Sequence, residues 1–142
     1  SVSHDPLNHQ KMVKLRAEKV ARVADFIPEQ KVHGDKEGGE LLVVGWGGTY
    51  GALRSAVDFM RERGKSVSHC HFNYINPLPR STEKIFSRFE KIVVCELNMG
   101  QFANYLRMEF QQFNYFQYNK VQGLPFTVSE LTEYFGKLLK QK

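Results

Sequence analysis

Residues 41–51 constrain the fold more than any other part of the sequence. Four consecutive apolar residues, from Leu41 to Val44, lead into a turn that holds four glycines within seven positions. Apolar residues then recur at i, i+3, i+4 and i+7, which is the spacing of one helical face. These residues are Leu53, Ala56, Val57 and Met60. Because the leading run is apolar on both faces, it favours a parallel strand that helices cover on both sides.

The ends of this helix can be predicted from the residues that flank it. Thr49 stands where its hydroxyl can accept a hydrogen bond from a first-turn N–H and so cap the helix. Gly64 follows the last turn, where a glycine in the left-handed conformation commonly ends a helix. We therefore expect a strand, a tight glycine turn and a helix in succession.

The rest of the chain continues to alternate between strand and helix patterns. We predict further strands at residues 67–74 and 92–95, an edge strand at 115–122, and helices that begin near Ser81, Phe102 and Thr127. Thr127 and Glu130 form a capping box, in which each side chain bonds the other residue's N–H. Strands separated by helices of this length indicate right-handed βαβ units. The predicted fold class is α/β, a three-layer α/β/α sandwich.

The composition fits one soluble globular domain, with 142 residues, 42% of them hydrophobic and 25% charged. No apolar run reaches the roughly 18 residues of a membrane span, and the start does not read as a signal peptide. We expect a connector helix over residues 1–27, a polar linker over 28–39 and the domain proper over 40–142. The connector's apolar stripe consists of small residues, namely Val13, Ala17, Val20 and Ala24. A cytoplasmic location is expected.

Much of the net charge of +5 comes from residues 11–22, which hold five basic residues and one acidic residue. A basic helix of this kind usually has a solvated face or docks on an acidic partner. Nucleic-acid binding through this helix is an alternative that the charge leaves open, although the rest of the chain is close to balanced. Neither a nucleic acid nor a membrane is the expected partner.

The glycine turn is the first of two candidate sites, because such sheets bind ligands beyond the carboxyl ends of their strands. Exposed N–H groups at a helix start suit an anion. The dinucleotide fingerprint fails, however, since Tyr50 stands where the third glycine belongs, and no Walker lysine follows. The turn's members are Gly45, Gly47, Gly48, Thr49, Tyr50 and Gly51. Three interpretations stay open: a tight turn with close helix packing, a contact with a partner subunit, and a phosphate site.

The second candidate site is the turn at residues 96–101, which follows the predicted central strand. Glu96 ends that strand, and Asn98, Gly100 and Gln101 precede the next helix. One interpretation is structural: Asn98 caps the helix, and Glu96 accepts backbone N–H bonds in the turn. The other is an interface or ligand role.

No catalytic set and no metal site are expected. His69 and His71 lie on one face of a strand, but Cys70 points the other way and no third ligand has suitable spacing. We expect two buried or half-buried histidines with hydrogen-bond partners. Cys70 and Cys95 are expected to be reduced thiols that pack as small apolar groups.

Five segments, in this order and spacing, resemble the carboxyl-terminal domain of the alpha subunit of 2-oxoacid:ferredoxin oxidoreductases, most closely the 2-oxoglutarate synthase type. The segments are NHQKMVKLRAEKV at 8–20, VVGWGGTYG at 43–51, NPLP at 76–79, ELNMGQ at 96–101 and NKVQGLPFT at 119–127. The resemblance covers nearly the whole chain. It implies a fold like the transketolase carboxyl-terminal domain, a mostly parallel five-stranded sheet with one antiparallel strand. Residues 115–122, or a short piece near Val32, are the candidates for that strand.

The resemblance also implies a parent enzyme that oxidatively decarboxylates a 2-oxoacid with coenzyme A and reduces ferredoxin. In that family thiamine diphosphate, with magnesium, lies between the beta subunit and an earlier domain of the alpha subunit. Iron–sulfur clusters need sets of cysteines that this chain lacks. The resemblance therefore implies a noncatalytic domain that binds neither cofactor. Its partners would be the beta subunit and the preceding alpha-subunit domain, where it supports assembly and helps to shape the active-site cleft.

Two other functions remain as alternatives from the residues alone. One is a free-standing phosphate- or nucleotide-binding module that uses the turn at 45–51. The other is a basic nucleic-acid adaptor that uses residues 11–22. A homodimer of the isolated chain is also left open, because a wide apolar strip tends to find a partner.

Overall fold

The computed structural model describes residues 22–141, in which four strands form one parallel sheet in the order β2-β1-β3-β4. The strands are β1 (Gly39–Trp46), β2 (Val67–Phe72), β3 (Phe89–Glu96) and β4 (Tyr115–Asn119). The helices are α2 (Tyr50–Glu62), α3 (Thr82–Phe86), α4 (Gln101–Glu109) and α5 (Val128–Lys140), with short 3-10 turns η1 (Ala24–Phe26) and η2 (Gly47–Thr49).

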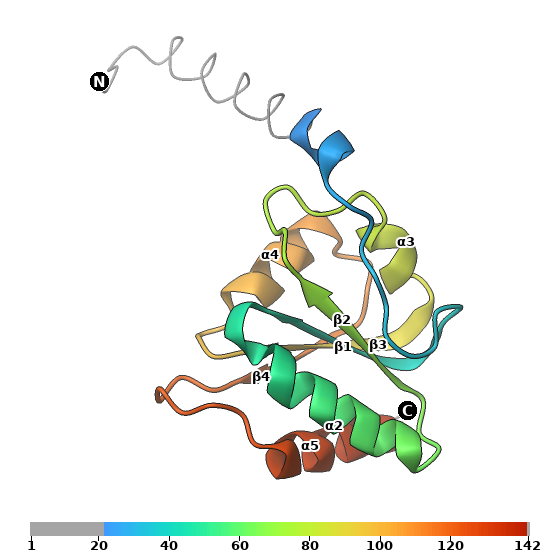
Figure 1. Cartoon of the computed structure of the whole chain (residues 1–142), viewed down its shortest axis with the longest axis vertical. Helices are drawn as coiled ribbons and strands as arrows, with labels where there is room; N and C mark the ends of the chain where they lie inside the picture. Colours follow the sequence, from blue (N-terminus) through green and yellow to red (C-terminus); the bar gives the residue numbers. More distant parts are fainter. Residues whose placement is uncertain (1–21, 142) are drawn as a thin grey trace.

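Helices cover both faces of the sheet, as the apolar strands predict. Figure 1 shows α2 and α5 on one face and α3 and α4 on the other. Alternate residues of β1 and β3 enter the two cores: Leu41 and Val93 face α2 and α5, whereas Leu42 and Ile92 face the other layer. All four side chains are almost completely buried. The three-layer α/β/α architecture is therefore confirmed.

The prediction of an antiparallel strand at residues 115–122 is wrong. β4 pairs in parallel with β3, with Ile92 opposite Tyr115 and Glu96 opposite Asn119. The reason is topological, because α4 carries the chain back across the sheet, so that β4 starts from the same end as β3.

A fifth strand is also not confirmed within residues 22–141. Near Val32 there is one antiparallel bridge, in which His33 and His69 exchange two backbone hydrogen bonds of 2.8 Å. Gly34 follows at a φ of +122°, which turns the chain away from β2 after this single pair. Figure 1 shows this segment, which we call the edge segment (residues 28–36), running beside β2.

Most of the connector predicted at residues 1–27 lies outside the described residues. This applies to Val13, Ala17 and Val20 of its stripe, to the family-like segment 8–20 and to all but Arg22 of the basic stretch. Ala24, the last residue of the stripe, lies in η1 and is buried. The domain limits at residues 27, 39 and 40 remain predictions.

The helix start predicted at Thr49 differs from the structure. Its hydroxyl donates to the carbonyl of Trp46 at 3.0 Å and accepts no first-turn N–H, so the predicted cap is wrong. The cause is η2, which places Thr49 already in a helical conformation. Gly64 has the expected left-handed φ of +76°, and the capping box of Thr127 and Glu130 is present.

Cys70 and Cys95 are both buried and unpaired, and they pack in opposite cores. Burial raises the pKa of both thiols, and the nearby charge of Glu96 adds to this effect at Cys95. Within residues 22–141, no helix combines the length and the hydropathy that crossing a bilayer would require.

The bonds to Glu130 predict a pH-dependent contribution to stability. Its carboxylate accepts hydrogen bonds from Lys120, Thr127 and Tyr118, and these bonds, chiefly that of Lys120, lower its pKa from 4.5 to about 2. Since the folded-state pKa is lowered, the stabilisation is complete above the unfolded value and is lost as the pH falls toward 2. The stability advantage of wild type over Glu130→Gln should therefore shrink over that range in urea unfolding.

The matched control is Glu133→Gln on the same helix. Glu133 forms an exposed ion pair with Lys137, 3.6 Å apart. Such pairs contribute little, so this variant should unfold like wild type at every pH. An equal pH dependence of the two variants would contradict the assignment to Glu130.

Candidate functional site

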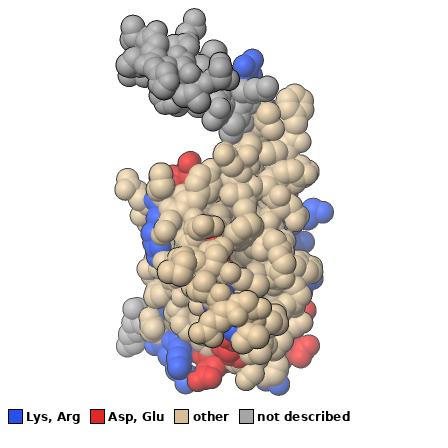
Figure 2. Space-filling view, turned by 90° about the vertical axis from the view of Figure 1, so that its left-hand side faces the viewer, with Lys and Arg blue, Asp and Glu red and all other residues tan. Residues whose placement is uncertain are grey.

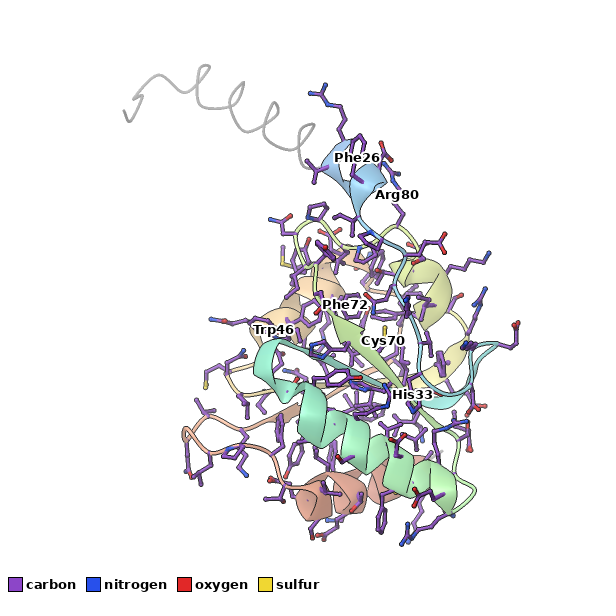
Figure 3. The ribbon with its side chains drawn as sticks, viewed as in Figure 1. Phe26, His33, Trp46, Cys70, Phe72 and Arg80 are labelled. Atoms are coloured by element: carbon purple, nitrogen blue, oxygen red, sulfur yellow. The ribbon has the colours of Figure 1, made fainter. Side chains whose placement is uncertain are left out.

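The two turns singled out from the sequence lie side by side at one edge of the sheet. They follow β1 and β3, which are hydrogen-bonded neighbours with Val44 opposite Val94. Trp46, at the end of β1, donates its indole N–H to Glu96 Oε1 at 3.2 Å. Figure 3 shows Trp46 at this end of the strand, and its ring meets that of Phe102 in α4 edge-on. The hydrogen bond between Trp46 and Glu96 thus joins the two turns.

Glu96 organises this structure from the inside. Its side chain is fully buried, although carboxylates rarely are. Its two oxygens accept the backbone N–H groups of Phe102, at 2.7 Å, and of Ala103, at 3.0 Å. These N–H groups belong to the first turn of α4, where they have no partner within the helix and where the helix dipole favours negative charge. These bonds agree with the structural interpretation of Glu96, as an acceptor of backbone N–H groups.

Asn98 and Gly100 complete the start of α4. Asn98 Oδ1 accepts the N–H groups of Gly100, at 2.7 Å, and of Gln101, at 3.1 Å, which agrees with the structural interpretation of this turn. Gly100 has a φ of +97°, and a Cβ there would lie 2.3 Å from the side-chain nitrogen of Gln117. Glycine suits that position because the positive φ strains other residues, and a side chain there would also displace the end of Gln117.

The glycines of the first turn fall into two groups. Gly45 is a packing residue, since a Cβ there would come within 2.2 Å of Leu53 Cδ1 and 2.8 Å of Thr49 Oγ1. By contrast, Gly47, Gly48 and Gly51 are exposed, and a Cβ on any of them would meet nothing within 4 Å. Close packing on α2 thus explains Gly45 alone, and the other three leave backbone open at the surface.

Around these turns lies a surface with few charges, which we call the carboxyl-edge surface. Figure 2 shows uncharged side chains over its centre and charged ones toward its lower end and margins. Its exposed apolar side chains come from the loops after β1, β3 and β4. They are Tyr50, Leu97, Met99, Val121 and Leu124, with exposed fractions between 40% for Leu97 and 75% for Met99.

The two histidines lie where the strand pattern places them, but one expectation about them is wrong. His69 is buried and His71 half-buried. However, His69 Nε2 and His71 Nδ1 are buried without any hydrogen-bond partner. Among residues 22–141 there is no group of three or more His, Cys, Asp or Glu that could hold a metal ion.

Sequence reasoning missed the roles of Trp46 and of the groups around the histidines. The sequence assigns no role to Trp46, because nothing in its spacing indicates a bond to a residue 50 positions later. The surroundings of the histidines depend on where the edge segment runs. Contacts with residues far away in the sequence fix it, among them the bridge at His33 and the bond from Gln30 Nε2 to the carbonyl of His71 at 2.7 Å. The sequence held no signal for the role of Trp46 or for the groups around the histidines.

The packing of Gly45 predicts opposite effects for two glycine substitutions in one turn. Gly45→Ala should destabilise the fold by about 1–3 kcal/mol, because the new methyl group overpacks against Leu53. Gly51→Ala should be neutral or stabilising by up to about 1 kcal/mol, since it lies in α2 with open space around it. Denaturant unfolding measures both, and an equal loss in the two variants would contradict the distinction.

The burial of Glu96 predicts a stability loss with a local optical signature. Glu96→Gln should cost about 2 kcal/mol, because an amide NH₂ would then face a backbone N–H of α4. Trp46 is the only tryptophan of the chain, so its fluorescence should report the loss of the negative charge beside its indole N–H in the folded variant. Glu90→Gln, an exposed change on the same strand, is the control and should alter neither. Unchanged stability and emission in Glu96→Gln would contradict the role described.

Comparison with known proteins gives a consistent result. The family model for pyruvate:ferredoxin oxidoreductase core domain II matches residues 39–131. The 2-oxoglutarate oxidoreductase subunit KorA of Mycobacterium tuberculosis (strain ATCC 25618 / H37Rv) is 35% identical over 138 residues, which are 97% of this chain and 21% of the relative.

Solved structures agree with this result. A 2-oxoglutarate:ferredoxin oxidoreductase from Magnetococcus marinus, with 2-oxoglutarate, coenzyme A and succinyl-CoA bound, superposes with a TM-score of 0.84 and 25% identity over 99% of this chain and 25% of that chain. A split gene transketolase, an inactive beta4 tetramer, gives a TM-score of 0.57 at 15% identity over 77% of this chain and 41% of that chain, and so supports the fold alone.

The chain spans about a fifth of the length of the curated relative and a quarter of the Magnetococcus chain. The family match covers more than half of the sequence and includes both turns. This chain therefore belongs to the family described as pyruvate:ferredoxin oxidoreductase core domain II.

Proposed function

We propose that this chain is a noncatalytic domain of the alpha subunit of a 2-oxoacid:ferredoxin oxidoreductase whose substrate is 2-oxoglutarate. In this role it joins the alpha and beta subunits and helps to shape the active-site cleft. The relation to a 2-oxoglutarate oxidoreductase subunit over 97% of the chain supports the substrate class. The carboxyl-edge surface is the observation that carries the assembly role.

The argument from this surface rests on its exposed apolar side chains. Met99, Leu124 and Val121 are more than half exposed and come from two separate loops at one edge of the sheet. Exposed apolar side chains that gather at one edge of a domain commonly mark an interaction site. About four-fifths of the curated relative lies outside the part that this chain matches, and we propose that the corresponding parts of the parent enzyme cover this surface.

The candidate site residues take the role of contacts in this proposal. The open backbone of Gly47, Gly48 and Gly51 allows a partner to approach closely, while Gly45, Thr49, Gly100 and the buried Glu96 hold the two turns in shape. Tyr50, Asn98 and Gln101 are the remaining members of the two turns.

The proposed organisation is a connector over residues 1–27, a linker over 28–39 and the domain over 40–142. The start of the family match at residue 39, where β1 also begins, supports the second limit. Figure 3 shows Phe26 projecting from η1 beyond the body of the domain, and its side chain is 87% exposed. We propose that it contacts the preceding alpha-subunit domain.

In the complete enzyme, as proposed, the 2-oxoacid is oxidatively decarboxylated with coenzyme A in the cytoplasm and the electrons pass to ferredoxin. Thiamine diphosphate, magnesium and the iron–sulfur cluster bind to other parts of the enzyme. The cysteine content supports this division, because cluster ligation requires several thiolates together, whereas Cys70 and Cys95 lie in separate cores.

Reconstitution tests the proposal. Co-expression of this chain with the remaining alpha-subunit domains and the beta subunit from the same genome should give a complex that reduces ferredoxin with 2-oxoglutarate. The double variant Leu97→Glu/Met99→Glu should lose at least about tenfold in association, because it places two charges in an apolar contact.

Phe59→Glu is the matched control. Phe59 is also a partly exposed apolar residue, but it lies nine residues beyond Tyr50 on α2, about 13 Å along the helix from the carboxyl-edge surface. This variant should assemble like wild type. Oxoacid turnover by the isolated chain would contradict the noncatalytic role, equal assembly of all variants would contradict the interface, and preference for pyruvate would contradict the substrate.

A further inference from the structure

Hydrogen bonds provide much of the attachment between the edge segment and the outer strand β2. The backbones of His33 and His69 exchange two bonds of 2.8 Å, and Gln30 Nε2 donates to the carbonyl of His71 at 2.7 Å. Figure 3 shows His33 beside β2, and Val32 packs partly against a core. A segment with few buried apolar contacts opens locally more readily than the sheet beside it.

Two ring nitrogens next to this attachment are buried without a partner. His69 is only 2% exposed, and its Nε2 has no hydrogen bond; Nδ1 of the half-buried His71 also has none. Buried polar atoms nearly always have partners, and an unsatisfied one is destabilising. Water would supply the missing partners if these rings became exposed. The attached arrangement therefore contains a cost that detachment relieves.

The two rings lie between the edge segment and α2. His33 Nε2 bonds Asp58 Oδ1 at 2.7 Å, so a side chain of the edge segment reaches the helix. On the helix, the ring of Tyr50 lies 5.5 Å from that of His69 and 5.1 Å from that of His71, between centroids. Detachment of the edge segment would remove one of the elements that separate these rings from water.

The attached state keeps both rings neutral. Burial lowers the pKa of His69 from 6.5 to about 3, with smaller effects in the same direction from His71, Arg54 and His33, and an opposing effect from Asp58. Burial also lowers the pKa of His71. A ring that is exposed to water regains a pKa near 6.5. Below that pH, the detached state binds more protons than the attached one.

The charges that face the two rings do not compensate for burial. Arg54 and Asp58 of α2 approach each other at 3.6 Å, and Asp58 is also bonded to His33. The other titratable or charged groups around the rings are Tyr50 of α2 and Glu29, Lys31 and Lys36 of the edge segment. The three cations outnumber the two carboxylates, so these surroundings add no net attraction for a protonated ring.

We propose that the edge segment is a pH-sensitive strap, which detaches from β2 on acidification because His69 and His71 take up protons only in the detached state. For His69 alone, the equilibrium constant for detachment should rise by about 30-fold between pH 7.5 and pH 5. His71 increases this factor. The edge segment joins η1 to β1, so detachment loosens the entry of the chain into the domain. This device does not depend on the proposed assembly role.

Amide hydrogen exchange of the full chain tests the proposal. The N–H groups of His33 and His69 bond each other's carbonyls, so their exchange reports detachment. Both should exchange faster than the N–H of Val94, which is buried in the central strand β3 and reports global unfolding. After correction for intrinsic rates, their opening constant should rise by about 30-fold or more from pH 7.5 to pH 5. Low urea should leave it unchanged, since little surface is exposed.

Two substitutions separate His69 from the other histidine of this attachment. His69→Phe keeps a ring but removes the proton site, so the dependence of opening on pH should shrink to the share of His71. His33→Gln is the matched control, because it removes a histidine and the bond to Asp58. Opening should then increase at every pH, while the ratio between pH 5 and pH 7.5 stays at about 30-fold.

Ring spectra of wild type give a test that needs no substitution. In the attached state, the ring of His69 should remain neutral from pH 7.5 to pH 5. Titration of this ring near pH 6.5 in the attached state would overturn the proposal. Exchange of His33 and His69 as slow as that of Val94 would also overturn it. So would a pH dependence that His33→Gln abolishes and His69→Phe retains.

Discussion

The carboxylate of Glu96 is the interaction on which the functional edge of this domain depends. It ends a central strand, is removed from water, and satisfies N–H groups of two α4 residues and of the Trp46 indole. One side chain therefore fixes the start of a helix against two neighbouring strands. A buried carboxylate is tolerated only when its lone pairs are occupied, so the positions of these elements are closely linked. The glycines nearby allow the backbone to approach as closely as this arrangement needs.

The layered core could be predicted from the sequence because strand burial leaves a direct pattern. Runs such as Leu41–Val44 and Ile92–Cys95 have no polar side, and only a sheet covered on both faces removes such runs from water. The capping box could also be predicted, because the hydrogen-bond partners Thr127 and Glu130 are only three residues apart. Asn98 and Glu96 belong to the same class, since their partners follow within seven residues.

The errors arise where a residue's environment is set by distant parts of the chain. Thr49 did not cap α2, because the preceding glycines form a 3-10 turn first. The antiparallel direction predicted for residues 115–122 was wrong, because the direction of a strand depends on the end of the sheet at which α4 leaves the chain. The spacing of side chains along the strand does not indicate that direction. The unpartnered nitrogens of His69 and His71 were unforeseeable for the same reason, since the contacts of the edge segment with β2 join residues far apart in the sequence. Contacts of the two turns with other chains depend on residues outside this chain, and local sequence patterns do not record them.

The two cysteines carry a chemical consequence of the layered core. Thiolates, and not thiols, react with alkylating agents and oxidants, and burial with a raised pKa suppresses that form at both positions. Cys70 lies in an outer strand and Cys95 in one with neighbours on both sides. Local opening of β2 at the edge of the sheet would expose the sulfur of Cys70 while that of Cys95 stays buried. The order in which the two cysteines are modified therefore distinguishes local opening from global unfolding.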